Sequence, residues 1–475
     1  MAGLIFPIHC INLPENPLLD CKEINTFFFI EDPVFFGIGN KSSSSSTTDP
    51  SKFKYNKKKI ILFRSAMKYY FKKLKQKKYK CYYIDYPARN YISQIKKKGF
   101  KEIHYIDPVD KTLQKQLKGS GIDFIEYETP LFITSEEILD KYAKEKIKSH
   151  NSFYINQRKE FDVLLTKDGK AKGGKWSYDT ENRDKLPKNI KIPKLPIISE
   201  NDIISEAKKY TEKNFGSYFG CVDDFNFPIS SNQAEKWLDS FIKKRLKNFG
   251  KYQDAISVKE SYIFHSIISS SLNIGLITPE KVLEKVEKSK SPINNVEGFI
   301  RQVLGWREYT RYYYTHIGPK NYMSLNYFGN KKSLGKEWYD GTTKIKALNV
   351  VIKNAFENAY LHHIERLMVV GNLMNISEIN PKHAYKWFME FAIDSYDWVM
   401  GLNVFSMAMY ADPSMTTKPY ISGSGYYLRM SEVSRGYDSS GFDKWDKIFR
   451  SFVKKHKKKL EKIPRMKMMI KSMKL

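Results

Sequence analysis

The chain has 475 residues, of which 41% are hydrophobic and 15% aromatic; this excludes wholesale disorder and favours two or three packed domains. A formal net charge of +29 favours a polyanionic partner, although translation of an AT-rich genome would also enrich lysine. The four cysteines, Cys10, Cys21, Cys81 and Cys221, form no CxxC pair, which excludes a disulfide scaffold and a cysteine-ligated metal site.

Residues 1–150 alternate between strand-like and helix-like segments, which predicts a doubly wound, Rossmann-like α/β domain with a parallel sheet. Strands are predicted at 26–32, 59–65 and 80–87, and helices at 66–78 and 93–100. Residues 39–55 contain five consecutive serines, and we expect a disordered surface loop there.

The start of the chain has no basic segment before its short apolar run, so we expect no signal peptide. No uncharged apolar run of about 18 residues occurs, and we expect no membrane span. The cysteine usage indicates an intracellular, reducing location, with cytoplasm, nucleus and virion left open.

Residues 151–200 are rich in Pro, Gly and Lys and are interpreted as a linker. Apolar residues at a spacing of three to four then predict an all-α domain over 201–455, followed by a basic tail at 456–475. Its long helices are predicted at 231–249, 296–314, 346–374 and 381–400.

The helix at 297–314 places Gln302, Trp306 and Tyr309 along one stripe, beside the i,i+4 pair Arg307 and Arg311. Such an aromatic stripe usually packs in a core. Interleaved Gln and Arg residues also suit a cleft that stacks flat rings and contacts phosphates.

The adjacent residues His362 and His363 would point about 100° apart on one helix. No third ligand stands at ligand spacing, so we expect no zinc site and interpret the pair as proton donors or acceptors. Arg366 on the same helix needs a buried carboxylate, and Asp394 or Asp397 in the next helix supplies one. The alternative is a structural ion pair with no ligand.

A serine-rich turn precedes the next apolar helix and carries His265, Ser266, Ser269, Ser270 and Ser271. Hydroxyl groups and free backbone N–H groups at a helix start can hold a phosphate. Serine-rich turns are common, so this feature is weak by itself.

Six segments occur together in one order: FGKYQDA, FHSIISSSLNIGLITP, EGFIRQVLGWREYTR, AYLHHIERLMVVGN, DSYDWVMGLN and MYADPSMTTKPYISGSGYYLRMS. In this order they resemble the FAD-binding domain of photolyases and cryptochromes, above all the bacterial photolyase-related branch of iron–sulfur cryptochromes and (6-4) photolyases. The segment KKKIILFRSAMKYYFKKL resembles the antenna domain of that branch. The resemblance covers nearly the whole chain.

The resemblance implies a light-driven photolyase that repairs pyrimidine dimers, either (6-4) photoproducts or cyclobutane dimers, by electron transfer from reduced FAD. It assigns FAD-binding positions to Tyr252, His265, Ser266, Ser269, Gln302, Arg307, Arg366, Asn372, Asp394 and Met400. It assigns lesion-facing positions to His362, His363 and Trp306, and DNA contacts to Arg311, Lys418 and Tyr420.

Residues for an electron relay to the flavin are chosen by proximity in sequence to these motifs: Trp387, Tyr396, Trp398, and Trp338 or Tyr339. The partner implied is UV-damaged DNA, and we expect a monomer. An antenna chromophore in residues 1–150, lumazine-like or none, is left open. The alternatives are a cryptochrome-type photoreceptor without repair activity and a nucleic-acid-binding protein that has lost its flavin.

Two positions depart from the branch. Its iron–sulfur cysteines correspond to Ala347, Ser434, Tyr437 and a position near Phe442, and no cysteine follows Cys221. Because such a cluster needs thiolate ligands, we expect none. The position that faces flavin N5 is Met400, whose thioether cannot form a strong hydrogen bond with the ring.

Overall fold

The computed structural model describes residues 1–39 and 46–473, so the centre of the predicted serine-rich loop and the last two residues of the tail lie outside it. The chain forms two compact units, each built from separated segments. The sheet unit comprises residues 1–142, 194–244 and 266–289, and the helical unit comprises 143–193, 245–265 and 290–475. The domain boundaries expected from the sequence remain predictions.

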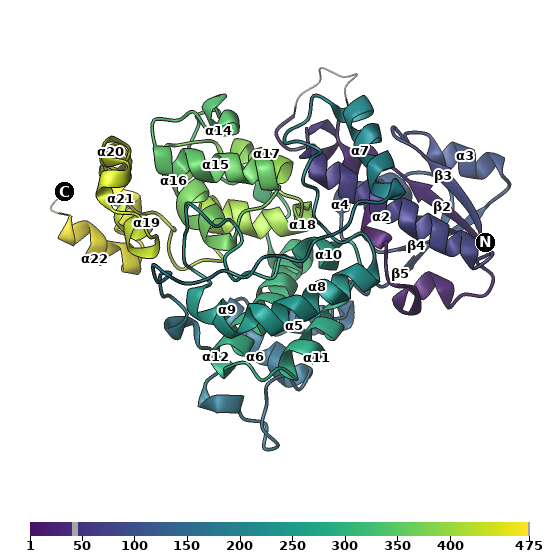
Figure 1. Ribbon diagram of the computed structural model, residues 1–475, viewed down its shortest axis with the longest axis horizontal. Coiled ribbons are helices and arrows are strands. Elements are labelled where there is room, and N and C mark those ends of the chain that lie inside the picture. The colour runs from purple at the N-terminus through teal and green to yellow at the C-terminus, as the bar shows by residue number, and fades with distance from the viewer. Residues whose placement is uncertain (40–45, 474–475) are drawn as a thin grey trace. The chain divides into compact units, whose positions relative to one another are not determined.

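The sheet unit contains one five-stranded parallel sheet in the order β3-β2-β1-β4-β5 (Figure 1). The strands are β1 (Ala2–Ile5), β2 (Thr26–Ile30), β3 (Lys80–Ile84), β4 (Glu102–Ile106) and β5 (Asp123–Tyr127). In the β1–β2 register Gly3 lies opposite Phe27, and a Cβ atom at Gly3 would lie only 2.7 Å from that ring. The doubly wound fold expected for this region is confirmed, with the predicted strands at 26–32 and 80–87 present as β2 and β3.

The strand predicted at 59–65 is wrong, because these residues belong to the helix α2 (Lys57–Gln76). Asn56 caps this helix by accepting a hydrogen bond from the backbone N–H of Lys58. Residues Ile60 to Phe63 are all buried, so this part of the helix is covered on every side. A helix that is apolar all round shows no 3.6-residue pattern, and a short run of it is then indistinguishable from a buried strand.

Helices complete the sheet unit. They are α3 (Tyr91–Lys97), α4 (Lys111–Lys118) and α5 (Glu136–Lys144), together with α7 (Asp202–Phe215), α8 (Ser231–Lys244), α10 (Ser269–Asn273) and α11 (Pro279–Glu287). The predicted helix at 93–100 is confirmed as α3, and that at 66–78 forms the second part of α2.

The helical unit starts with α6 (His150–Glu160), which lies within the predicted linker; the backbone over 182–193 is mostly irregular. Its later helices include α9 (Leu246–Tyr252), α12 (Ile293–Ile300), α13 (Glu308–Tyr312), α14 (Glu337–Asp340), α15 (Lys346–Asn358), α16 (Asn372–Ile376), α17 (Pro381–Phe391), α18 (Asp397–Met400), α19 (Gly425–Met430), α20 (Ser439–Lys455), α21 (Lys457–Leu460) and α22 (Pro464–Ser472). Helix α9 packs closely against α12, because a side chain at Gly250 would collide with the backbone of Asn294 and Asn295.

The predicted helix at 296–314 is continuous but contains two π-helical stretches, η7 (Arg301–Arg307) and η8 (Tyr313–Ile317). A further π-helical stretch, η10 (Glu365–Gly371), carries Arg366. Such stretches are rare and are often found at functional sites. Stretches η7 and η10 lie within segments selected from the sequence, η8 starts near the end of one, and a fourth stretch, η11 (Gly401–Ala408), starts within another.

The predicted helix at 346–374 is interrupted. Ala359 adopts a left-handed conformation (φ 54°, ψ 24°) and ends α15, and helical backbone resumes only at His363. His362 therefore does not share a helix with His363, which corrects the expectation that both lie on one helix. The predicted helix at 381–400 is likewise broken between α17 and α18.

Among the described residues, no helix combines the length and apolar character needed to cross a membrane.

Candidate functional site

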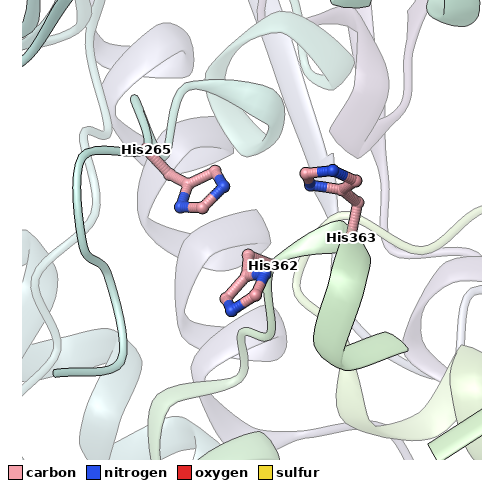
Figure 2. Close-up of side chains that lie close together, drawn as sticks. All are labelled: His265, His362 and His363. Atoms are coloured by element: carbon pink, nitrogen blue, oxygen red, sulfur yellow. The ribbon is translucent and has the colours of Figure 1, made fainter. Parts of the chain in front are cut away.

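Three histidines from distant parts of the sequence meet in the helical unit (Figure 2). His265 and His362 come from irregular backbone and His363 from the start of a helix. The rings of His265 and His362 stack with centroids 4.8 Å apart at an angle of 10°, and His363 lies edge-on to both. We call His265, His362 and His363 the histidine cluster.

The pair His362–His363 was expected to bind no metal, because no third ligand stands near it in the sequence. The structure corrects this assumption, because the fold places His265 beside the pair. No local spacing rule could have found a partner so far away in the chain.

Two members of the cluster are fixed by hydrogen bonds. His265 Nε2 lies 3.1 Å from the carbonyl oxygen of Gln253, and His363 Nε2 lies 3.1 Å from Oδ1 of Asp254. Gln253 and Asp254 directly follow α9, so the packing of α9 positions both rings.

Burial controls the charge of the cluster. Desolvation lowers the pKa of His265 to about 3 and that of His362 well below its usual value, so both rings are neutral at physiological pH. Burial also raises the pKa of the neighbouring Glu365 to about 8. The His363 side chain is 46% exposed and is the only member that reaches solvent to a large extent.

Arg366 and Asp394 form the ion pair that the sequence analysis expected. Nη2 of Arg366 lies 3.0 and 3.2 Å from the two carboxylate oxygens, and its Nε donates to the carbonyl of Leu361 at 2.7 Å. The guanidinium also lies over the ring of Phe391 at 5.5 Å. The pair ties η10 to the turn before α18, near the histidine cluster in sequence.

Asp397, the alternative carboxylate, has other partners. It accepts hydrogen bonds from the hydroxyl groups of Tyr314, Tyr322 and Tyr385 at 2.8, 2.5 and 2.7 Å. Three tyrosine donors on one buried carboxylate connect α18 with α17 and with the long helix that contains η8. The network is not visible in the sequence, because its three tyrosines come from separate positions along the chain.

Trp306 stacks face to face on His150, with centroids 3.7 Å apart at 13°. Both are in the helical unit. Gln302 bonds back to the carbonyl of Gly298, and the Arg307 guanidinium lies 5.3 Å from the ring centroid of Trp398. The predicted stripe therefore forms an aromatic wall in which His150, not foreseen from the sequence, is a member.

Two predicted relay residues are neighbours. The indole N–H of the buried Trp387 donates to the backbone carbonyl of Trp338 at 2.7 Å, and the Trp387 ring lies 4.7 Å from that of Phe391. Phe391 also contacts Arg366. Tyr396 and Trp398 are buried as well, and the hydroxyl of Tyr339 donates to Glu390 at 3.2 Å.

The other predicted FAD-binding residues differ in position. Tyr252 is buried in a small core with Phe264, and Met400 is buried at the end of α18. The amide of Asn372 is committed to Ser422, whose backbone it both donates to and accepts from. Ser266 and Ser269 belong to the sheet unit, where the carbonyl of Ser266 accepts from the indole of Trp237.

Of the three predicted DNA contacts, Lys418 and Tyr420 are half-buried in the irregular segment before α19. Arg311 is only 1% exposed. This burial argues against a direct contact between Arg311 and DNA, because the guanidinium is not presented on the surface.

The family model described as deoxyribodipyrimidine photo-lyase-related protein matches residues 27–227. A (6-4) photolyase of Agrobacterium fabrum is 36% identical over 285 residues, which is 59% of this chain and 56% of that protein. The chain is thus similar in sequence to photolyase-related proteins, and it spans about half the length of the (6-4) photolyase that it matches.

Two solved structures share the fold. A bacterial class III photolyase from Agrobacterium tumefaciens has a TM-score of 0.57 at 15% identity, covering 95% of this chain and 86% of that one. A cryptochrome of Synechocystis sp. PCC6803 has a TM-score of 0.55 at 14% identity, covering 96% and 89%. The predicted combination of an α/β domain with a helical domain is thereby confirmed.

The resemblance to photolyases and cryptochromes implies FAD, and the buried polar groups of the helical unit fit a polar ligand. Gln253 Oε1, His265 Nδ1 and both ring nitrogens of His362 are buried and form no hydrogen bond within the described part of the chain. Such orphaned groups are rare in folded proteins unless a ligand or water completes them. Of these residues, His362 lies in the same segment as Arg366, which pairs with Asp394.

The positions that correspond to cluster cysteines do not fit an iron–sulfur cluster. The backbone N–H of Ala347 donates to Asp438 at 3.2 Å. Nζ of Lys346 lies 4.3 Å from the ring centroid of Tyr437, and Phe442 packs against Tyr427. These groups offer no thiolate. Packing and hydrogen bonds connect the same segments instead.

Proposed function

We propose that this chain is a light-driven DNA photolyase that splits UV-induced pyrimidine dimers, with FAD as its cofactor. The sequence similarity to photolyase-related proteins and the net charge of +29 support this proposal. Bound FAD supplies the light-driven electron transfer, and the protein supplies binding, orientation and exclusion of water.

One observation carries the proposal of repair: an exposed histidine is held by a carboxylate beside two buried neutral histidines. Asp254 accepts a hydrogen bond from Nε2–H of His363 and fixes the ring, which leaves Nδ1 to face a bound lesion; Nδ1 can donate a proton when the ring is in its doubly protonated form. A (6-4) photoproduct needs such a proton before it splits, whereas a cyclobutane dimer does not. His362 is buried, and we assign it to positioning and not to proton transfer with solvent.

The residues proposed to hold FAD are those that the resemblance assigns, among them Arg366, Asp394 and Gln302, with Met400 beside the ring. We assign electron supply to Trp387 and Trp338, which are in direct contact. We also propose that the chain lacks an iron–sulfur cluster. UV-damaged DNA is the proposed partner, and its damaged bases would flip out of the duplex into the site.

The test uses purified, reduced protein with oligonucleotides that carry either a (6-4) photoproduct or a cyclobutane dimer, under blue light and in darkness. Light-dependent loss of at least one lesion is expected. A yellow, photoreducible protein that repairs neither lesion would instead favour a cryptochrome-type photoreceptor. A preparation without flavin absorbance would contradict both.

A further inference from the structure

We propose that the histidine cluster is a binding site for a borderline transition-metal cation of the Zn²⁺ class, and that occupancy by this metal inhibits repair. One ring nitrogen from each of His265, His362 and His363 lies within 4.8 Å of the other two. Neutral imidazole nitrogens are preferred ligands of Zn²⁺, Ni²⁺ and Cu²⁺. Three such ligands leave a fourth position for water, as in open zinc sites.

The surroundings of the cluster match those of metal-binding histidines. Such residues usually donate their second ring nitrogen to a carbonyl or a carboxylate. Nε2 of His265 lies 3.1 Å from the Gln253 carbonyl, Nε2 of His363 lies 3.1 Å from Asp254, and Nε2 of His362 lies 3.4 Å from Glu365 Oε2. Each ring thus has an oxygen near one nitrogen.

A second, independent observation is the lack of partners on the buried rings. His362 is 2% exposed; its Nδ1 forms no hydrogen bond with any described residue, and its Nε2 has only the 3.4 Å approach to Glu365, which is too poorly aligned for a hydrogen bond. Nδ1 of His265 is also buried and forms no hydrogen bond with any described residue. Buried polar atoms without partners are costly, and a metal ion would satisfy them.

The metal-free geometry must contract for the ion to bind. Zn–N bonds of about 2.0–2.1 Å in a tetrahedral site place the nitrogens about 3.3 Å apart. The rings of His265 and His362 are stacked, so they must rotate toward a common point. His363 is free to follow, because its side chain is partly exposed and is held by a single carboxylate.

Ligand chemistry excludes Mg²⁺ and Ca²⁺ as the metal ion bound by the histidine cluster. Mg²⁺ and Ca²⁺ prefer oxygen ligands and would not select three imidazoles. Inhibition follows because a bound metal would engage the ring nitrogens of His363 that the lesion needs. This consequence rests on the proposed repair function, whereas metal binding itself does not.

The test measures Zn²⁺ bound per chain by equilibrium dialysis of the full-length flavoprotein after chelator treatment. A parallel titration with Co²⁺ follows its ligand-field absorption. We expect one Zn²⁺ per wild-type chain and at least about tenfold weaker binding by His363→Gln. The His363 side chain is 46% exposed, so its replacement should leave the fold intact. His383→Gln, in the same unit but outside the cluster, is the matched control and should bind like the wild type.

A second variant tests the surroundings. Asp254→Asn should weaken Zn²⁺ binding by about 10–100-fold without abolishing it, as other changes behind a ligand do. Equal Zn²⁺ and Co²⁺ binding by wild type, His363→Gln and His383→Gln would overturn the site. No binding by the wild type would do the same.

The repair arm is separate. Zn²⁺ should inhibit light-driven repair by the wild type, with recovery after chelation, while the same concentration of Mg²⁺ should not. A protein that binds Zn²⁺ through His363 but repairs no lesion would contradict the proposed function and leave the metal site standing. Full repair activity with the site saturated would overturn the inhibitory role.

Discussion

Each unit contains a buried polar cluster, and the two clusters differ in how many of their polar atoms form hydrogen bonds. In the sheet unit Glu31 Oε1 accepts hydrogen bonds from Arg64 and Tyr83, both at 2.7 Å, and Oε2 accepts from the Tyr86 backbone and the Tyr210 hydroxyl at 3.0 and 2.6 Å. All four lone-pair sites of this carboxylate are used.

In the helical unit the histidine cluster is only partly paired. Three of its ring nitrogens are buried without hydrogen-bond partners in the described chain. A complete network stabilises a fold, because breaking it leaves a charge uncompensated, whereas an incomplete one implies that something else binds. The comparison therefore directs the search for a ligand to the histidine cluster, where three such nitrogens lie together.

The largest effect is expected at the incomplete cluster. His363→Ala should lower the rate of (6-4) repair by about 100-fold or more, because a positioned acid contributes about 10²–10⁴ to rate. Cyclobutane repair, if present, should keep most of its rate. Single-turnover repair of each lesion checks this, with His383→Ala as control, and an equal loss on both lesions would contradict the proton-donor role.

Substitutions in the fully hydrogen-bonded Glu31 cluster should change the stability of the fold and not the repair rate. Glu31→Gln leaves Arg64 without its fully buried partner and should lower the free energy of unfolding by about 3–5 kcal/mol. Glu206→Gln removes another partner of Arg64 whose side chain is 46% exposed, and should cost about 1 kcal/mol or less. Urea unfolding measures both, and similar losses would show that burial is not the deciding variable.

Asp32, next to Glu31, should make the stability of the sheet unit depend on pH. Burial raises its pKa from 3.8 to about 6, so the folded state keeps a proton that the unfolded state has lost between these values. Stability should therefore fall as pH rises across this window. Asp32→Asn keeps the acceptor for the Val34 N–H and should stabilise the protein at neutral pH by about 2–3 kcal/mol.

The check is urea unfolding at about pH 4 and about pH 7, on either side of this window. The wild type should lose stability between the two, and Asp32→Asn should lose less. A stabilisation of the variant that is equal at both pH values would show that proton binding by Asp32 is not its cause.

The smallest effect is expected at the break before the histidine cluster. Ala359→Gly should raise the free energy of unfolding by about 0.5–1 kcal/mol, because glycine adopts the left-handed conformation without strain. Repair should stay unchanged, since the backbone path to His362 is kept. Thermal unfolding and the repair assay check this, and a loss of stability would indicate that Ala359 is not strained.

Much of the fold could be predicted from local pattern. The doubly wound α/β region, the helical remainder and the pair Arg366–Asp394 follow from periodicity and from the need of a buried arginine for a carboxylate. The strand at 59–65 was wrong because a fully buried helix loses its period. The break at Ala359 was missed because no Gly or Pro marks it.

The site was predictable only in part, residue by residue. His363 and Arg366 were found from their own motifs. Asp254, Gln253 and His150 were missed, because their roles depend on which distant residue packs beside them. The burial of Arg311 was also not visible, since an i,i+4 pair of arginines gives no sign of which face is covered.

The sequence by itself determined the order of the motifs, the fold class and the absence of cysteines beyond Cys221, because these are properties of local composition and spacing. Tertiary packing brings His265 beside His362 and His363 and leaves three of their ring nitrogens without a hydrogen-bond partner among the described residues. Contacts between residues distant in the chain depend on how whole helices pack, and local periodicity does not encode that packing. The same packing turned a histidine pair, first interpreted as unable to bind metal, into a cluster of three.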